Sequence, residues 1–216
     1  MKRLMKHNTM ENTADTDHKF DDIAQNIFFP IYPVIADDII FRTKKTKGRM
    51  IDVGCGGGHL GFALMEKTEC RGWFVDTDES ALLIAENRAQ ERGLAERAVF
   101  LRQDVHCMEF PDNFADLIIS RGSCCFWDDL EKALLEIYRV LAPGGRTYIG
   151  GGLGSKELAA SIYRKMQTII PGWPEQINRR SEGITDELLG EILDRNGILR
   201  EIVNNETKDR WIIMRK

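Results

Sequence analysis

Two hydrophobic periods alternate along most of the chain. Short apolar runs predict buried strands at Met50–Val53, Gly72–Val75, Val99–Arg102, Leu117–Ser120 and Thr147–Gly150. Between these runs apolar residues recur every three or four positions, which predicts helices at Leu60–Lys67, after the capping residue Asp78, and at Leu130–Leu141. Strands that alternate with helices in this way form a parallel sheet with helices on both faces.

The C-terminal part of the chain breaks this rhythm. A helix predicted at Asp186–Arg195 is followed by two strand-like runs, Leu199–Val203 and Trp211–Met214. The connection between them, Asn204–Asp209, is too short for a crossover, so the two strands must pair antiparallel. The whole pattern predicts an α/β fold with a doubly wound, seven-stranded sheet that is mostly parallel and contains one antiparallel strand.

Three segments lie outside the strand–helix alternation. Residues 1–19 are polar and aperiodic, which predicts a disordered tail ahead of a single domain over residues 20–216. Phe20–Phe41 is apolar and rich in aromatic residues, and we expect two short cap helices there, broken at Pro30 and Pro33. Residues 155–183 contain a predicted helix and a Pro-Gly-Trp-Pro turn. We expect this segment and the cap helices to form a lid over the carboxyl edge of the sheet, where ligands bind in open α/β sheets. The alternative is that their aromatic residues pack against the sheet as core.

The composition and charge of the chain mainly argue against certain partners and locations. The 216 residues carry 30 Lys and Arg against 34 Asp and Glu, a net charge of −4, which argues against nucleic acid as a partner. The longest apolar stretch, Ile27–Ala36, contains two prolines, so we predict neither a membrane span nor a membrane partner. No apolar run of a signal peptide follows Lys2 and Arg3. The five irregularly spaced cysteines indicate reduced thiols, and we therefore expect a cytoplasmic protein without a metal site.

The most informative stretch joins the first strand to the helix after it. It reads Met50-Ile51-Asp52-Val53-Gly54-Cys55-Gly56-Gly57-Gly58-His59-Leu60-Gly61. Glycines between a strand and a helix build a backbone cradle, because glycine permits a tight turn and the close approach of a ligand. Two registers compete. Gly54-x-Gly56-x-Gly58 is the pattern of S-adenosylmethionine sites, whereas Gly56-x-Gly58-x-x-Gly61 matches a dinucleotide fingerprint.

Residues at the ends of other strands decide between the registers. Asp76 closes the second predicted strand, where its carboxylate can accept both ribose hydroxyls of either cofactor. Asp104 and Val105 close the third strand, so that Asp104 can face the amino group of an adenine. The fifth strand is preceded by the run Glu136-Ile137-Tyr138-Arg139-Val140-Leu141-Ala142-Pro143-Gly144-Gly145-Arg146.

Together with Asp52, these residues resemble the class I S-adenosylmethionine-dependent methyltransferases over about residues 50–152. Within that family the chain is most similar to the small methyltransferases that act on metabolites, often called type 11. The resemblance implies a Rossmann-like fold with an antiparallel ending and S-adenosylmethionine as the cofactor. It also implies transfer of a methyl group to a small-molecule acceptor by in-line displacement, which gives S-adenosylhomocysteine and is catalysed mainly by positioning.

The resemblance further implies cofactor contacts at particular positions. Asp52 would lie near the methionine ammonium, and Gly54, Cys55 and Gly56 would line the methionine. Asp76 would hold the ribose, Thr77 would flank the adenine, and Asp104 and Val105 would contact the base. Arg121 would touch the methionine end and face the acceptor. One position departs from the family. Many relatives carry a histidine before the position of Trp127, and this chain has Phe126, so no catalytic base is assigned. A thiol, amine or carbanion acceptor would need none.

Two other functions fit parts of the pattern. A catalytically silent module would keep the S-adenosylmethionine pocket for sensing or assembly. An NAD(P)-dependent oxidoreductase would use the second glycine register, but it should carry a Tyr-x-x-x-Lys pair, and neither Tyr138 nor Tyr163 has a lysine four residues on. The sequence defines neither the acceptor nor the oligomeric state.

Several reactive side chains have a structural interpretation. Cys124 and Cys125 follow the fourth strand near the expected acceptor, and we interpret them as small packing residues rather than functional thiols. His59 and His106 are interpreted as local structural residues. The glycine-rich run Gly150–Gly154 is either a flexible exit from the fifth strand or part of the approach for the acceptor, and both interpretations stay open.

Overall fold

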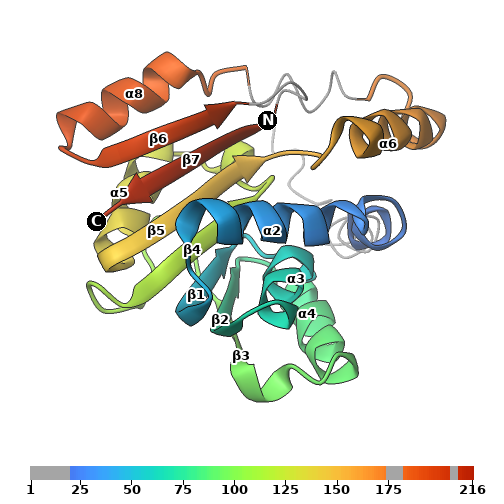
Figure 1. Ribbon diagram of the computed structural model, residues 1–216, viewed down its shortest axis with the longest axis horizontal. Coiled ribbons are helices and arrows are strands. Elements are labelled where there is room, and N and C mark those ends of the chain that lie inside the picture. Colours follow the sequence, from blue (N-terminus) through green and yellow to red (C-terminus); the bar gives the residue numbers. More distant parts are fainter. Residues whose placement is uncertain (1–19, 174–181, 205–208) are drawn as a thin grey trace, which may run out of the picture.

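A single twisted sheet of seven strands forms the centre of the computed structural model, which describes residues 20–173, 182–204 and 209–216 (Figure 1). The strands lie in the order β3-β2-β1-β4-β5-β7-β6. Their bounds are β1 (Lys47–Val53), β2 (Glu69–Asp76), β3 (Ala98–Arg102), β4 (Ala115–Arg121), β5 (Leu141–Gly151), β6 (Leu199–Asn204) and β7 (Arg210–Arg215). All neighbouring strands pair parallel except β7, which is antiparallel to both β5 and β6. The predicted seven-stranded sheet with one reversed strand is therefore confirmed.

Helices cover both faces of the sheet. They are the π-helical turn η1 (Ala24–Phe28), α2 (Ile31–Thr43), α3 (His59–Glu66), α4 (Glu79–Glu91), the short 3₁₀ turns η2 (Ala95–Arg97) and η3 (Cys124–Phe126), α5 (Leu130–Val140), α6 (Lys156–Ile169) and α8 (Asp186–Arg195). One hydrophobic cluster joins α2, α3, α4 and α6 to strand residues such as Met50 and Ile119, and the other joins α5 and α8 to Ile51 and Ile118. Successive strand residues thus enter opposite cores, which is the period-two pattern of a doubly wound sheet.

The N-terminal cap contains one break instead of the two that we expected. The segments Phe20–Phe28 and Ile31–Thr43 meet at an angle of 80° around Pro30. Pro33 lies inside α2, at the third helical position, where a backbone N–H would have no intrahelical partner and proline costs little. Among the described residues no single helix is long and apolar enough to cross a membrane, and only this bent pair, taken together, passes that test.

The fifth strand also begins earlier than predicted. Leu141 already pairs with Ala115, and pairing resumes at Arg146 opposite Leu117. The Pro143-Gly144-Gly145 turn therefore forms a bulge within β5, and it does not precede the strand. The proposed tail of residues 1–19 and part of the proposed lid, residues 174–181, lie outside the described residues.

The reversed strand β7 is attached to β5 through a buried hydroxyl group. Thr147 is fully buried, and its Oγ1 donates to the carbonyl of Ile212 at 3.1 Å and accepts from the amide of Met214 at 2.8 Å. A threonine side chain therefore hydrogen-bonds two backbone groups of β7 in the buried interior.

We expect Thr147→Val to lower the free energy of unfolding by about 2 kcal/mol, because the near-isosteric side chain leaves both backbone groups unpaired. Urea denaturation measures the change. Thr147→Ser is the matched control, since it keeps the hydroxyl and loses only a methyl group, at a cost of about 1 kcal/mol. Equal stability of the valine variant and the wild type would contradict this account of the β5–β7 junction.

Candidate active site

A cavity of about 1120 Å³ opens at the carboxyl ends of β1, β2 and β4. This is the place where strand order reverses, because the chain continues from β1 to β2 and β3 on one side and places β4 and β5 on the other. The cavity is lined by all the residues predicted to contact the cofactor, namely Asp52, Gly54, Cys55, Gly56, Asp76, Thr77, Asp104, Val105 and Arg121. The fold thus brings together residues that lie up to about 70 positions apart in the chain.

The glycine loop has the shape of the first of the two registers. Gly54, Gly56 and Gly58 adopt φ values of 63°, 51° and 77°, in the left-handed region that glycine favours. Gly61 has a different requirement, because a Cβ atom there would lie 2.4 Å from the ring of Phe74. Gly61 thus allows α3 to pack closely on the strands, whereas the left-handed loop conformation requires the three glycines of Gly54-x-Gly56-x-Gly58.

Asp52 is a buried carboxylate at the base of the cavity. Its side chain is 2% exposed, and Oδ2 accepts a hydrogen bond from the amide of Gly61 at 3.0 Å. The pKa of Asp52 is raised from 3.8 to about 7, mainly by burial and also by the nearby Asp76, although the hydrogen bond from Gly61 opposes the increase. No described cationic side chain pairs with Asp52. A bound cation at this point would relieve the cost of burying the ionised form.

Asp76, at the end of β2, hydrogen-bonds both the glycine loop and the turn that leads into α4. One carboxylate oxygen accepts from the amide of Gly56 at 2.8 Å, and the other accepts from the amide of Asp78 at 3.1 Å. Asp78 in turn caps α4 by accepting from the amide of Ser80 at 2.7 Å. Each carboxylate oxygen of Asp76 keeps further acceptor capacity toward the cavity, since an ionised carboxylate has about four lone-pair sites.

The turn after β3 supplies the opposite wall of this half of the cavity. Asp104 lies two residues beyond the end of β3, and its Oδ1 accepts from the amide of His106 at 2.8 Å and bonds the ring Nδ1 at 2.5 Å. These hydrogen bonds lower the pKa of Asp104, so it is ionised at neutral pH. The other ring nitrogen of His106 accepts from the amide of Asp129 at 3.3 Å. His106 therefore has a structural role, as expected, and Val105 beside it is buried.

Arg121 extends from the end of β4 toward the other half of the cavity. Its Nε and Nη2 donate to the carbonyl of Gly152 at 3.2 and 3.1 Å. The guanidinium lies 5.2 Å from the ring centre of Phe28 and 5.4 Å from that of Tyr32, in cation–π contact. Arg121 forms no ion pair with any residue that the structure describes. Within that part of the chain the site thus holds a partly buried cation that faces the cavity without a carboxylate partner.

The glycine-rich run after β5 is held in place beside this arginine. Gly152 accepts from Arg121, and the amide of Leu153 donates to Asp209 Oδ1 at 3.0 Å. A Cβ atom at Gly152 would lie 2.5 Å from the Asp209 carboxylate. These contacts favour the interpretation of Gly150–Gly154 as a shaped part of the cavity wall over that of a flexible exit.

The remaining wall is aromatic. Trp173 packs against Phe28, with ring centres 6.4 Å apart, and against Tyr163 at 4.9 Å. Cys124 and Cys125 also line the cavity, and burial raises the pKa of Cys124 to about 11, so that its thiol is neutral at physiological pH. This supports the interpretation of Cys124 as a packing residue.

Sequence reasoning missed a cluster of polar side chains behind the glycine loop. Asp21 accepts from His59 and from Arg88, and all three are at least partly buried. A signal was present, because Arg88 follows Ala85 by three residues and Ala81 by seven, on the buried face of α4. A cation at such a position requires a buried partner, although the sequence does not say which one.

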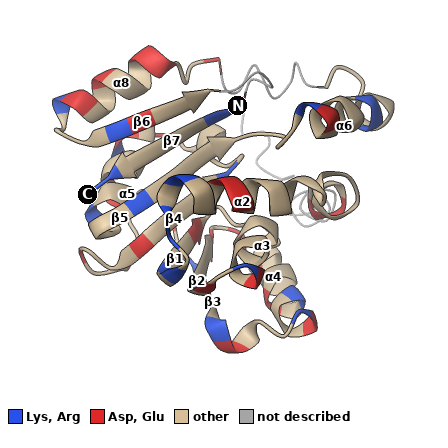
Figure 2. Cartoon of the chain, in the orientation of Figure 1, with Lys and Arg blue, Asp and Glu red and all other residues tan. Residues whose placement is uncertain are grey.

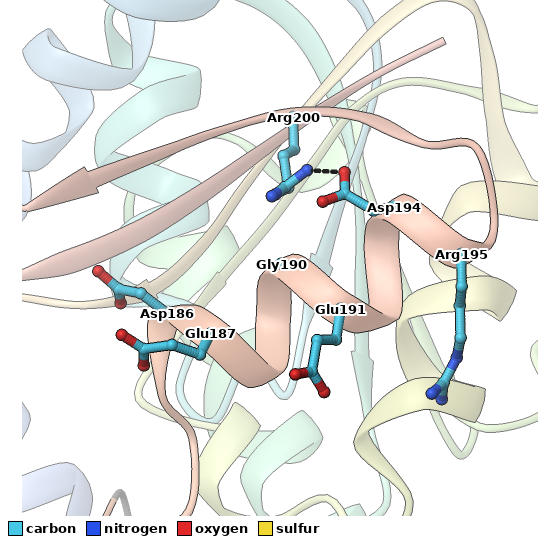
Figure 3. Close-up of a pocket in the computed structure, with 7 residues that line it drawn as sticks. All are labelled: Asp186, Glu187, Gly190, Glu191, Asp194, Arg195 and Arg200. Carbon is cyan, nitrogen blue, oxygen red and sulfur yellow. Dashed lines mark hydrogen bonds and ion pairs between the residues drawn. The ribbon is translucent and has the colours of Figure 1, made fainter.

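A second hollow lies on the outer side of α8 (Figure 3). It is lined by Asp186, Glu187, Gly190, Glu191, Asp194, Arg195 and Arg200, and Arg200 donates to Asp194. None of the predicted site residues lies there. Figure 2 shows acidic residues along α8 and a basic residue only at its C-terminal end. The two arginines of this hollow are engaged in ion pairs, Arg195 with Glu131 and Arg200 with Asp194.

Comparison with known proteins gives consistent matches. The family model "Methyltransferase domain" matches residues 51–149. The demethylmenaquinone methyltransferase of Thermus thermophilus is 39% identical over 109 residues, which are 49% of this chain and 48% of that protein. The ubiquinone/menaquinone biosynthesis C-methyltransferase UbiE of Francisella philomiragia is 27% identical over 134 residues, 61% of this chain and 54% of that one. The chain thus spans about half the length of the curated relatives that it matches.

A solved structure matches over nearly the whole chain. It is a protein of Methanococcus maripaludis described as a candidate S-adenosyl-L-methionine-dependent methyltransferase, with 38% identity and a TM-score of 0.89, and the match covers 98% of this chain and 97% of that one. The glycine loop, the acidic strand ends and the antiparallel ending agree with this likeness. The chain belongs to the class I S-adenosylmethionine-dependent methyltransferases, in the broad group of small methyltransferases called type 11.

Proposed function

We propose that this protein transfers a methyl group from S-adenosylmethionine to a small-molecule acceptor and releases S-adenosylhomocysteine. The observation that carries the proposal is the single cavity that contains all the expected cofactor contacts and extends beyond them to the aromatic wall around Trp173. Two relatives whose names state methylation in quinone biosynthesis support a small organic acceptor.

The residues of the cavity fit the parts of S-adenosylmethionine. The unpaired, buried Asp52 would hold the ammonium, with the backbone of Gly54, Cys55 and Gly56 along the methionine. Asp76 would accept the ribose hydroxyls. The adenine would lie between Thr77 and the turn at Asp104 and Val105, and Arg121 would face the methionine carboxylate and the acceptor. When bound, the cofactor supplies a methyl group on a sulfonium centre that is already activated.

The chain's own contribution to catalysis is positioning and the exclusion of water. Phe126 stands where many family members have a histidine, and both ring nitrogens of His106 are engaged by Asp104 and Asp129. His59 uses its Nε2 to bond Asp21. These contacts favour an acceptor that needs no base from the enzyme, such as a thiol, an amine or a stabilised carbanion.

We also propose that part of the cap and the segment around α6 act as a lid. Phe28 and Tyr32 from the cap and Tyr163 and Trp173 from the other segment line the acceptor half of the cavity. Helix α2 buries Ile31, Ile35 and other residues in the core, so we assign the contribution of the cap to the lid to Phe20–Phe28, which Asp21 joins to Arg88 and His59. The expected location in the cytoplasm is also a proposal, and it is supported by five cysteines that are all free thiols.

Calorimetry and a transfer assay test the proposed function together. We expect S-adenosylmethionine and S-adenosylhomocysteine to bind and NAD not to bind, and labelled methyl donor to label a compound in a metabolite extract. Tight binding of NAD with no response to the other two would reject the proposal. Binding of S-adenosylmethionine without any labelled product across extracts would favour a silent binding module instead.

Asp52 should make the ligand-free protein less stable as the pH rises. Its pKa is about 7 in the folded protein against an ordinary value of 3.8, so between pH 4 and 7 the native state binds more protons than the unfolded state. Stability is therefore lost over this range, by about 4 kcal/mol at roughly 1.4 kcal/mol per pKa unit. We expect Asp52→Asn to match the wild type at pH 4 and to be more stable at pH 8 in urea denaturation. Parallel profiles of the two proteins would contradict the assignment.

Asp76 should be required for cofactor binding. Its removal takes away the expected ribose acceptor and the bond to the Gly56 amide, at a cost of about 2–4 kcal/mol, so we expect Asp76→Ala to weaken S-adenosylhomocysteine binding roughly thirty-fold or more in calorimetry. Asp116→Asn is the control, since Asp116 accepts from the amide of Arg49 near the start of β1. Unchanged affinity in Asp76→Ala would show that the ribose binds elsewhere.

A further inference from the structure

Arg88 links helix α4 to the middle of the glycine loop. Its side chain is 11% exposed, and Nη1 donates to the carbonyl of Gly57. The same group forms a two-pronged ion pair with Asp21, in which Nη1 and Nη2 donate to the two carboxylate oxygens at 3.1 and 2.8 Å. A forked pair of this kind fixes orientation as well as distance.

Asp21 extends the contact to two further segments. Its Oδ1 accepts from His59 Nε2 at 2.9 Å, at the start of α3, and the His59 ring stacks on Tyr32 with ring centres 5.1 Å apart. Burial alone would raise the pKa of Asp21, but the hydrogen bonds from His59 and Arg88 lower it well below its usual range. Burial lowers the pKa of His59, so at neutral pH a neutral imidazole donates to an ionised carboxylate.

This cluster explains why position 57 is a glycine. Gly57 is a variable position in both glycine registers, and its φ is not in the left-handed region, so its backbone would accept alanine. A Cβ atom at Gly57 would nevertheless lie 2.1 Å from Asp21 Oδ1 and 2.2 Å from Arg88 Nη1. The ion pair occupies the space that any side chain would need, which explains a glycine that the loop conformation does not require.

We propose that Arg88 and Asp21 are positioning residues for cofactor binding: their ion pair holds the Gly57 carbonyl, fixes the glycine loop and ties the segment Phe20–Phe28 to it. The inference rests on the proposed role of the glycine loop as the cofactor site. A loop with several left-handed glycines has many unfolded conformations, and a fixed carbonyl in its middle removes much of that freedom before the ligand arrives. The cost of ordering the loop is then met during folding, and the affinity for the cofactor rises.

Single and double variants of the pair test the proposal by calorimetry with S-adenosylhomocysteine. We expect Arg88→Met and Asp21→Asn each to weaken binding about ten-fold, and the double variant to weaken it little more than either one, because the two residues act as a unit. Arg88→Lys should recover part of the affinity, since it keeps the charge and loses the fork. Turnover should show a raised KM for S-adenosylmethionine with kcat nearly unchanged. Glu66→Gln is the control, because it removes a different ion pair, between the end of α3 and Arg92 at the C-terminus of α4, away from the loop.

Gly57→Ala gives an independent test. In the wild-type background its Cβ displaces the ion pair, and we expect about the same ten-fold loss of affinity. In an Asp21→Ala, Arg88→Ala background the space is free, so the alanine at position 57 should cost nothing further. An equal loss in both backgrounds, or full affinity in Arg88→Met, would overturn the proposal.

Hydrogen exchange of the ligand-free proteins separates this inference from the proposed function. We expect faster exchange over residues 54–58 and Phe20–Phe28 in Arg88→Met than in Glu66→Gln and the wild type. Wild-type protein that fails to bind S-adenosylhomocysteine would reject the proposed function and leave this measurement intact. Identical exchange in Arg88→Met and the wild type would reject the ion pair as a positioning device, whatever the ligand.

Discussion

The position of β1 between β2 and β4 is the constraint on which the site depends. The chain leaves β1 for β2 and β3 on one side of the sheet, while β4 and β5 lie on the other, so the connections diverge and a crevice opens at the carboxyl ends. The glycine loop, Asp76 and Arg121 meet in that crevice because they follow β1, β2 and β4 directly. The buried carboxyl-terminal halves of these strands thus place residues from distant parts of the sequence around one ligand, and none of these residues depends on a long loop for its position.

Charge in the crevice is separated and not neutralised. Asp52 and Asp76 lie near the glycine loop, close enough for Asp76 to raise the pKa of Asp52, and Arg121 lies toward the aromatic wall with only a carbonyl and ring faces around it. Carboxylates at one place and a guanidinium at another are complementary to a ligand that carries an ammonium, hydroxyl donors and an anionic group. The methionine and ribose parts of S-adenosylmethionine have these groups. Without a ligand these separated charges lower the stability of the folded protein, as is common for a preformed binding site.

The sequence predicted the parts of the molecule that follow from local pattern. The strand and helix order and the reversed strand follow from hydrophobic period and short connections. The expected cofactor contacts came from strand-end positions such as Asp76 and Asp104 and, for the other residues, from the resemblance to the family. The pattern placed a second helix break at Pro33 and the start of β5 at Thr147, and both were wrong because a first helical turn tolerates proline and a glycine turn can form a bulge inside a strand. The partnership of Asp21 with Arg88 joins positions 67 residues apart. No local hydrophobic period predicts such a pair, and its one signal in the sequence was the position of Arg88 on the buried face of α4.

The two halves of the cavity are formed by different kinds of segment, and the N-terminal cap contacts both. The cofactor half consists of strand ends and one loop, whereas the acceptor half is made of side chains from segments outside the strand–helix alternation, including Phe28, Tyr32 and Trp173. Because Asp21 bonds the loop through Arg88 and His59, and His59 stacks on Tyr32, the acceptor wall and the glycine loop share one structural element. Coupling of this kind is reciprocal: a cofactor bound to the ordered loop also stabilises the wall, and an acceptor that packs on the wall strengthens cofactor binding. In the proposed lid, closure is then most favoured when both molecules are present, which is when shielding the methyl group from water serves the reaction.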